Sequence, residues 1–190
     1  MYGIHGTCVS LAEKINEEGF KKSITGRAGP GVYFWRYFSD PTYASYLGYE
    51  WWKYSDKRGN YNKKHITNKK CCLIQAEIII NDGIVFDLSH GRYKESLRNF
   101  INSGLQRLKG QPDYDLQEEN EVSALFELFV AKVEKMIGKR ITAIITDVAV
   151  PKGSGKSIGK YFGASSEAII VLDTNNIKIL SSEEVENYDY

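Results

Sequence analysis

The sequence predicts an α+β domain built around a mostly antiparallel sheet. Short apolar, β-branched segments, too short for helices, occur near both ends and in the middle of the chain. Longer segments with helical periodicity do not alternate regularly with them, which disfavours a parallel, doubly wound sheet. No repeat and no linker divides the 190 residues. We therefore expect one domain over residues 1–190, ending in an acidic, exposed tail at 181–190.

Each expected element has a local justification. The strands are expected at residues 2–7, 32–35, 71–80, 83–87, 141–150, 168–172 and 177–180. The helices are expected at residues 10–18, 41–54, 93–108 and 119–137. The last helix carries an apolar stripe that we assign to the core: Val122, Leu125, Phe126, Phe129, Val130 and Val133.

Three helix ends have recognisable signals. Ser10 and Glu13 are spaced as a capping box, in which each side chain bonds to the other residue's backbone N–H. Gly19 suits the left-handed residue that ends a helix. Asp40 followed by Pro41 is typical of a capping residue and the first helical position.

The bulk composition excludes several classes of protein. The chain is 42% hydrophobic and 26% charged with a net charge of +1, and it lacks an apolar run long enough to span a membrane. No secretory leader is recognisable, so a cytoplasmic location is expected. Cys71 and Cys72 are adjacent in an apolar run, which favours reduced, buried thiols. His5, His65 and His90 are far apart and no metal-ligand spacing occurs, so we expect no metal.

Two segments are rich in lysine. Residues 57–70 contain no Asp or Glu and are expected to form a solvated loop. Residues 151–163 combine Gly and Lys, and 153–157 look like part of a phosphate-binding loop. That motif requires a further glycine where this chain has Val150, so a nucleotide-triphosphate site is rejected.

Three separated motifs contain residues of types that bind ligands or take part in catalysis. They are His5-Gly6-Thr7 in the first strand, Gly31-Val32-Tyr33-Phe34 in the second, and Ser166-Glu167-Ala168 at the start of a later one. In order and spacing they resemble the His-Tyr-Glu signature of the diphtheria-toxin-like and PARP-like ADP-ribosyltransferases. The resemblance implies a split, mostly antiparallel sheet with flanking helices.

Further segments extend the resemblance over most of the chain. Gly19-Phe20-Lys21 follows at the distance at which PARP-like enzymes place a basic residue facing adenosine. Ala44-Ser45-Tyr46 is similar to the segment that supplies a second aromatic ring, with about two extra residues before it. Leu73–Glu77 looks like their apolar strand, and Val150–Gly153 resembles the opening of their acceptor-side loop. The loop before Gly31 is shorter here than in the family.

The resemblance assigns a role to each residue. Cleavage of the nicotinamide–ribose bond of NAD develops positive charge on the ribose, and the Glu167 carboxylate would stabilise it. Tyr33, with Tyr46, would stack on nicotinamide, and the Gly6 backbone would approach the carboxamide. His5 would bond to the adenosine ribose. The implied NAD-binding set is His5, Gly6, Thr7, Lys21, Tyr33 and Tyr46.

Each of these residues also has a plain structural explanation, which the sequence leaves open. His5 can be a core histidine, Tyr33 a packing aromatic, and Glu167 a surface residue at a strand start. Lys21 can simply be solvated.

The leading hypothesis is an NAD-dependent transfer of ADP-ribose to a macromolecular acceptor, favouring RNA, with NAD as co-substrate and no metal. Lysine and aromatic residues of the kind that bind single strands lie before Glu167: Lys152, Lys156, Lys160 and Tyr161. Small bacterial enzymes of this type act as toxins or anti-phage effectors held by an antitoxin protein. The alternatives are a protein mono-ADP-ribosyltransferase, an RNA 2′-phosphotransferase of the same superfamily, and a non-catalytic NAD or ADP-ribose-binding module.

Overall fold

One seven-stranded sheet organises the protein, with strand order β4-β5-β6-β2-β1-β3-β7. The computed structural model describes residues 1–24, 26, 28–108, 114–151 and 165–188. The strands are β1 (Tyr2–Cys8), β2 (Val32–Tyr37), β3 (Cys71–Ile78), β4 (Ile84–Asp87), β5 (Ile141–Ala149), β6 (Ser165–Val171) and β7 (Ile177–Val185). In the described parts of the chain only β4 and β5 pair in parallel, so the α+β prediction is confirmed.

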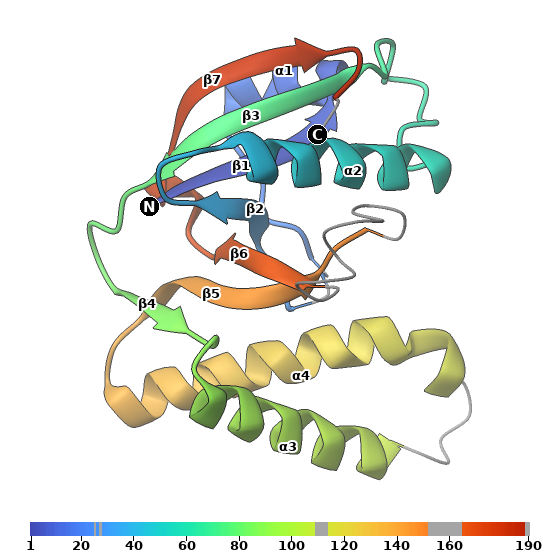
Figure 1. The fold of residues 1–190 in the computed structure, drawn as a ribbon. Coiled ribbons are helices and arrows are strands. Elements are labelled where there is room, and N and C mark those ends of the chain that lie inside the picture. Colours follow the sequence, from blue (N-terminus) through green and yellow to red (C-terminus); the bar gives the residue numbers. More distant parts are fainter. Residues whose placement is uncertain (25, 27, 109–113, 152–164, 189–190) are drawn as a thin grey trace.

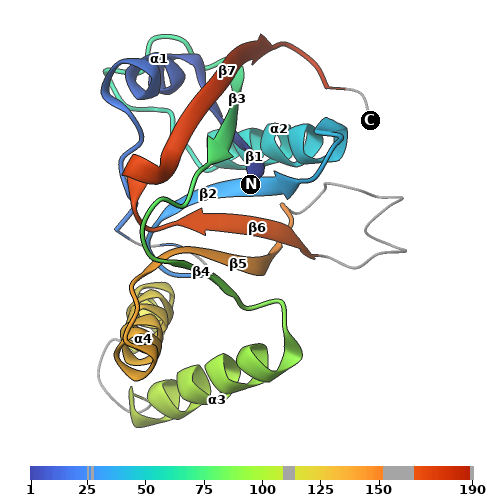
Figure 2. The same ribbon diagram turned by 90° about the vertical axis from the view of Figure 1, so that its left-hand side faces the viewer.

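Four helices and one short turn of 3-10 helix complete the described fold. They are α1 (Val9–Glu18), α2 (Thr42–Lys57), α3 (Gly91–Leu108), α4 (Tyr114–Ile137) and η1 (Thr174–Asn176). Figures 1 and 2 show α1 and α2 on opposite faces of the sheet, near β1 and β3. Helices α3 and α4 lie side by side near the β4–β5 end (Figure 1). None of the described helices has the length and apolar character needed to cross a membrane.

The apolar character of β5 and β6 follows from their place inside the sheet. Each has strands on both sides and covered faces, so Ile144, Ile169 and Ile170 are fully buried. The predicted stripe of α4 packs on this part of the sheet, with Phe126 and Phe129 in one cluster with Ile144 and Ile170. Burial of these side chains is the main source of the sheet's stability.

The start of α1 differs from the prediction, and its end agrees with it. The residue preceding α1 is Cys8, and no side chain caps the helix, so the capping box at Ser10 is wrong. The Ser10 hydroxyl instead accepts from the backbone N–H groups of Thr67 and Asn68, at 3.2 and 2.8 Å. The Ser10 oxygen that was expected to cap the helix is therefore bonded to a loop distant in the sequence. Gly19 ends the helix with a φ of 78°, as predicted.

Two other boundaries are refined by the structure. Helix α2 begins at Thr42 with Pro41 as the residue before it, so both predicted positions are one residue too early, although the Asp40 carboxylate accepts from the backbone N–H of Thr42 at 2.9 Å. Strand β7 continues through Val185, which places half of the expected acidic tail in the sheet beside β3. The described acidic side chains of the tail are exposed as predicted, whereas Val185 and Tyr188 are half-buried. Lys70 bonds to Glu184 and Glu186 at 2.7 and 3.0 Å.

Candidate functional site

The sheet contains a gap between β1 and β2. Residues Tyr2–Ile4 of β1 pair with Trp35–Tyr37 of β2, and the pairing stops there. On its other side β1 pairs with β3 along its whole length, from Tyr2 to Cys8. The second half of β1 and the first half of β2 are therefore neighbours in the sheet without being joined by a hydrogen-bond ladder.

A pocket of about 440 Å³ occupies this gap. Most of its wall comes from β1, β2, α1 and the segment that joins α1 to β2, and Trp51, Val148 and Ala168 add to it from α2, β5 and β6. Most of the lining is apolar, including Leu11, Ile15, Val32, Phe34, Trp35 and Trp51. Polar groups are few and stand at defined places, which is the usual composition of a site for a small organic ligand.

His5 lies in the pocket wall in a well-defined state. Its Nδ1 is 2.9 Å from the backbone carbonyl of Tyr33, and a carbonyl only accepts, so Nδ1 carries the hydrogen. The ring packs edge-on against Phe20, with ring centres 5.3 Å apart, and beside Phe34. Burial lowers the pKa of His5, although the bond to the carbonyl opposes part of this effect. The neutral ring therefore has Nε2 as a hydrogen-bond acceptor.

Tyr33 also lines the pocket, and its hydroxyl is bonded to the preceding loop. The hydroxyl donates to the carbonyl of Gly29 at 2.5 Å and accepts from the N–H of Ala28 at 2.9 Å. A Cβ on Gly26 would lie 2.4 Å from the same hydroxyl, so glycine is required for this close approach. The ring thus connects β2 to the glycine-rich loop that helps to line the pocket.

Gly6 lines the pocket but makes room for a helix. A Cβ at this position would lie 1.9 Å from the carbonyl oxygen of Gly48 in α2. The space left by the missing side chain is therefore filled by the backbone of α2. Approach of a ligand to Gly6, as the resemblance implies, has to come from the pocket side.

Of the other NAD-binding candidates, Thr7 and Lys21 line the pocket and Tyr46 does not. Thr7 is buried, whereas the Lys21 ammonium is exposed and bonds to Glu18 at 2.5 Å. Tyr46 lies on α2 beside Tyr43, with ring centres 6.3 Å apart. The structure therefore brings together five of the six residues and leaves Tyr46 outside the wall.

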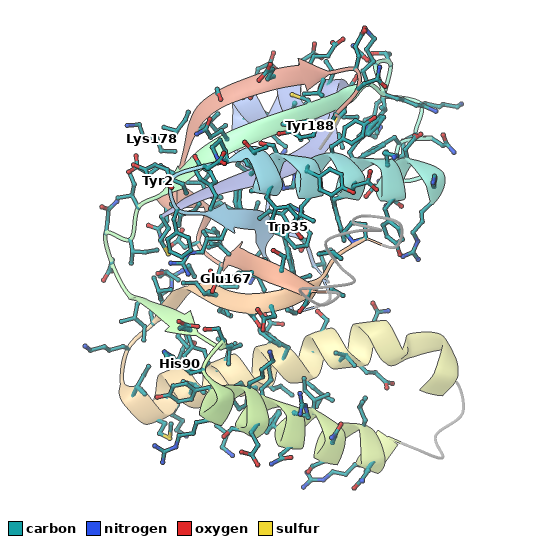
Figure 3. The ribbon with its side chains drawn as sticks, in the orientation of Figure 1. Tyr2, Trp35, His90, Glu167, Lys178 and Tyr188 are labelled. Atoms are coloured by element: carbon teal, nitrogen blue, oxygen red, sulfur yellow. The ribbon has the colours of Figure 1, made fainter. Side chains whose placement is uncertain are left out.

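Glu167 stands next to the pocket and does not line it. Its neighbour Ala168 lines the pocket and pairs with Trp35 across β2 and β6. Figure 3 shows Trp35 and Glu167 on these adjacent strands. Because side chains alternate along a strand, Glu167 points to the opposite face from Ala168. There its Oε2 accepts from Nη1 of Arg36 at 2.7 Å.

The sequence analysis did not identify Arg36, Trp35 or Trp51 as site residues. Trp35 and Arg36 directly follow the Val-Tyr-Phe motif. Because side chains alternate along a strand, the sequence could have predicted that Trp35 and Arg36 lie on opposite faces of β2. Trp51 is on α2, and only the packing of that helix on β1 brings it to the pocket.

The predicted acceptor-binding residues Lys152, Lys156, Lys160 and Tyr161 lie outside the described residues, as does the segment 153–157. Within the described residues, no group of three or more His, Cys, Asp or Glu side chains could hold a metal ion. The three cysteines are buried and unpaired, and burial raises the pKa of Cys71 to about 12 and of Cys72 to about 11. Their thiols are therefore protonated near neutral pH.

Comparison with known proteins finds no match. No protein-family model, no curated protein and no solved structure matches this chain.

Proposed function

We propose that the protein is an NAD-dependent ADP-ribosyltransferase that uses the pocket between β1 and β2. The observation that carries this proposal is the meeting of His5, Gly6 and Tyr33 in the wall of one pocket of about 440 Å³. These residues come from motifs about thirty positions apart that resemble the family's signature. The volume lies within the range of pockets that bind small organic ligands.

The proposed role of each side chain follows from its chemistry. His5 Nε2 accepts a hydrogen bond from a ribose hydroxyl, because its Nδ1 is already bound to Tyr33. The Tyr33 ring offers a flat face to nicotinamide. When the ribose–nicotinamide bond breaks, its electron pair leaves with nicotinamide. The acceptor then bonds to the ribose carbon and releases a proton to water.

Glu167 is the proposed stabiliser of the ribosyl cation, a role that requires a carboxylate near the reacting carbon. Glu167 directly precedes Ala168, which lines the pocket, and this position supports the role. Its bond to Arg36 holds the carboxylate just outside the pocket wall, so the ligand must extend to the end of the pocket lined by Trp35 and Ala168 for direct contact.

The place of Glu167 outside the pocket wall favours a second candidate function. If a bound ligand does not extend to Glu167, the protein binds NAD or ADP-ribose without cleaving it. The separating experiment incubates purified protein with NAD and follows nicotinamide release, while calorimetry measures binding of NAD and of ADP-ribose. Nicotinamide release that disappears in Glu167→Gln supports the transferase, whereas binding of intact NAD without release supports the binding module. Absence of both binding and release contradicts both functions.

The acceptor we propose is a nucleic acid, on the basis of the lysines and aromatic residue at positions 152–161. Labelled NAD is offered with total RNA, DNA and protein, and the labelled fraction is identified by mass spectrometry. Label on RNA or DNA that weakens with rising salt and with Lys152, Lys156 and Lys160 changed to Glu is expected. Label found only on protein and unaffected by these changes contradicts a nucleic-acid acceptor.

A further inference from the structure

The ion pair between Arg36 and Glu167 is unusually protected. The two residues are adjacent on β2 and β6, because Trp35 pairs with Ala168 in an antiparallel register. Arg36 is 18% exposed and Glu167 31% exposed, and no other ion pair of the described residues has both members below one third. Water therefore weakens this interaction less than it weakens the others.

The surroundings give Arg36 a fixed position. On β1 the residue opposite Arg36 is Gly3, which has no side chain to compete for the space. The guanidinium also lies over the ring of Phe38, 4.4 Å from its centre, where a cation is stabilised by the ring. Arg36 therefore has a contact with the Phe38 ring in addition to its bond to Glu167.

The same surroundings would not hold Glu167 without Arg36. Asp147 on β5 lies directly opposite Glu167, and like charges in that arrangement repel. The neighbouring cation, Lys94 on α3, bonds to Asp147 at 2.6 Å. Farther out, His90 lies 3.8 Å from Asp87. Asp147 thus has its own cation, Lys94, and the cation bonded to Glu167 is Arg36.

The pair also adjoins the pocket. Arg36 follows Phe34 by two residues and shares its face of β2, and Phe34 lines the pocket. Trp35 and Ala168, the neighbours of the two charged residues, line it as well. A small movement of Arg36 or Glu167 would therefore change the charge at this end of the pocket.

We propose that Arg36 is a positioning residue, which holds the Glu167 carboxylate in one orientation beside the pocket. This inference rests on the proposed function, since it concerns the carboxylate assigned to the reaction. It assigns Arg36 no contact with NAD. Its effect is on the rate of cleavage and not on NAD affinity.

The test compares Arg36→Gln, Arg36→Lys and the control Lys94→Gln, which breaks the neighbouring ion pair. We expect Arg36→Gln to lower kcat about 100-fold, since misplacing a reacting group has effects of this size, with KM and NAD affinity unchanged. Arg36→Lys is expected to restore most of kcat because the observed bond uses a single nitrogen of Arg36. Lys94→Gln is expected to stay within about twofold of the wild type. Equal kcat in Arg36→Gln and wild type, or equal losses in all three variants, overturns the proposal.

A second readout needs no catalysis. Selective ¹³C labelling of glutamate, with Glu167→Gln to assign the signal, reports whether the Glu167 side chain keeps one rotamer. One rotamer is expected in the wild type and Lys94→Gln, and averaging between rotamers in Arg36→Gln. Averaging already present in the wild type overturns the proposal, even if the protein does not cleave NAD. A wild type that keeps one rotamer but releases no nicotinamide contradicts the proposed transferase alone.

Discussion

Two parts of the candidate site are held by different kinds of bond. In the ring site, defined as His5 and Tyr33, both side chains bond to the backbone: His5 to the Tyr33 carbonyl, and Tyr33 to Gly29 and Ala28. In the charged pair, defined as Arg36 and Glu167, both partners are side chains. A backbone partner moves only when its strand or loop moves, whereas side-chain partners can rotate. The ring site is thus suited to hold a ligand in place, whereas the orientation of Glu167 depends on one side-chain partner, Arg36.

Removing the charge from the charged pair should have the largest effect. Glu167→Gln keeps the shape of the side chain and its place on β6 but loses the charge that would stabilise the ribosyl cation. We expect nicotinamide release to fall by a factor corresponding to about 3 kcal/mol, with NAD affinity and thermal stability nearly unchanged. Steady-state kinetics, calorimetry and thermal unfolding measure the three quantities.

Asp147→Asn is the matched control, because Asp147 lies opposite Glu167 with a similar exposure, 35% against 31%. It removes a carboxylate from the same face of the sheet without touching the proposed reacting group. Turnover should therefore remain close to that of the wild type. A folded Glu167→Gln protein with full turnover would falsify the assignment of Glu167.

A change in the ring site should affect binding and not turnover. In His5→Asn the amide N–H₂ can still donate to the Tyr33 carbonyl, but the acceptor Nε2 is lost. We expect NAD affinity to fall about tenfold, close to the loss of one hydrogen bond of about 1.4 kcal/mol, with kcat at saturating NAD preserved. His5→Ala also loses the internal bond and should unfold at a lower temperature. Unchanged NAD affinity in both variants, measured by calorimetry, means that His5 is structural.

The ring site also predicts a pH dependence of stability. Burial lowers the pKa of His5 in the folded protein below its usual value of 6.5. Between these two pKa values the unfolded chain binds a proton that the folded protein does not, so stability falls as the pH drops below about 6.5. The slope due to His5 is at most about 1.4 kcal/mol per pH unit, and it should be absent in His5→Asn. Denaturant unfolding of both proteins at several pH values measures it, and identical slopes contradict a buried, neutral His5.

The sequence could predict the ring site better than the charged pair. The motifs around His5 and Tyr33 are local, and the gap between β1 and β2 places both in one wall. The face on which Glu167 lies depends on the pairing of Trp35 with Ala168, which is a long-range property. Alternation along β6 indicates only that Glu167 and Ala168 face opposite ways, and not which of them meets the pocket.

The same distinction explains the errors and successes in the fold. Gly19 ends α1 through its own backbone conformation, so a local signal was sufficient. The Ser10 hydroxyl was expected to cap the helix, but residues 67 and 68 donate to it, and nothing near Ser10 in the sequence indicates that loop. The extension of β7 to Val185 likewise depends on pairing with β3, because acidic residues such as Glu183 and Glu184 disfavour a strand locally.

The smallest effect is expected when the ring site loses a single hydroxyl. Tyr33→Phe keeps the ring that would stack on nicotinamide but removes the bonds to Gly29 and Ala28. We expect a loss of about 1 kcal/mol in the free energy of unfolding. Because these bonds hold the loop that helps to line the pocket, NAD affinity should also fall, by about threefold. Denaturant unfolding and calorimetry measure the two changes.

Tyr37→Phe is the control for this variant, because Tyr37 is on the same strand and its hydroxyl accepts from the side chain of Gln75, away from the pocket. It should cost a similar amount of stability, about 1 kcal/mol, and leave NAD affinity unchanged. If both variants weaken NAD binding equally, the effect comes from general loosening of β2 and not from the loop. If neither does, the Tyr33 hydroxyl stabilises the fold alone, and the fixed position of the ring site must come from His5 and the packing of its neighbours Phe20 and Phe34.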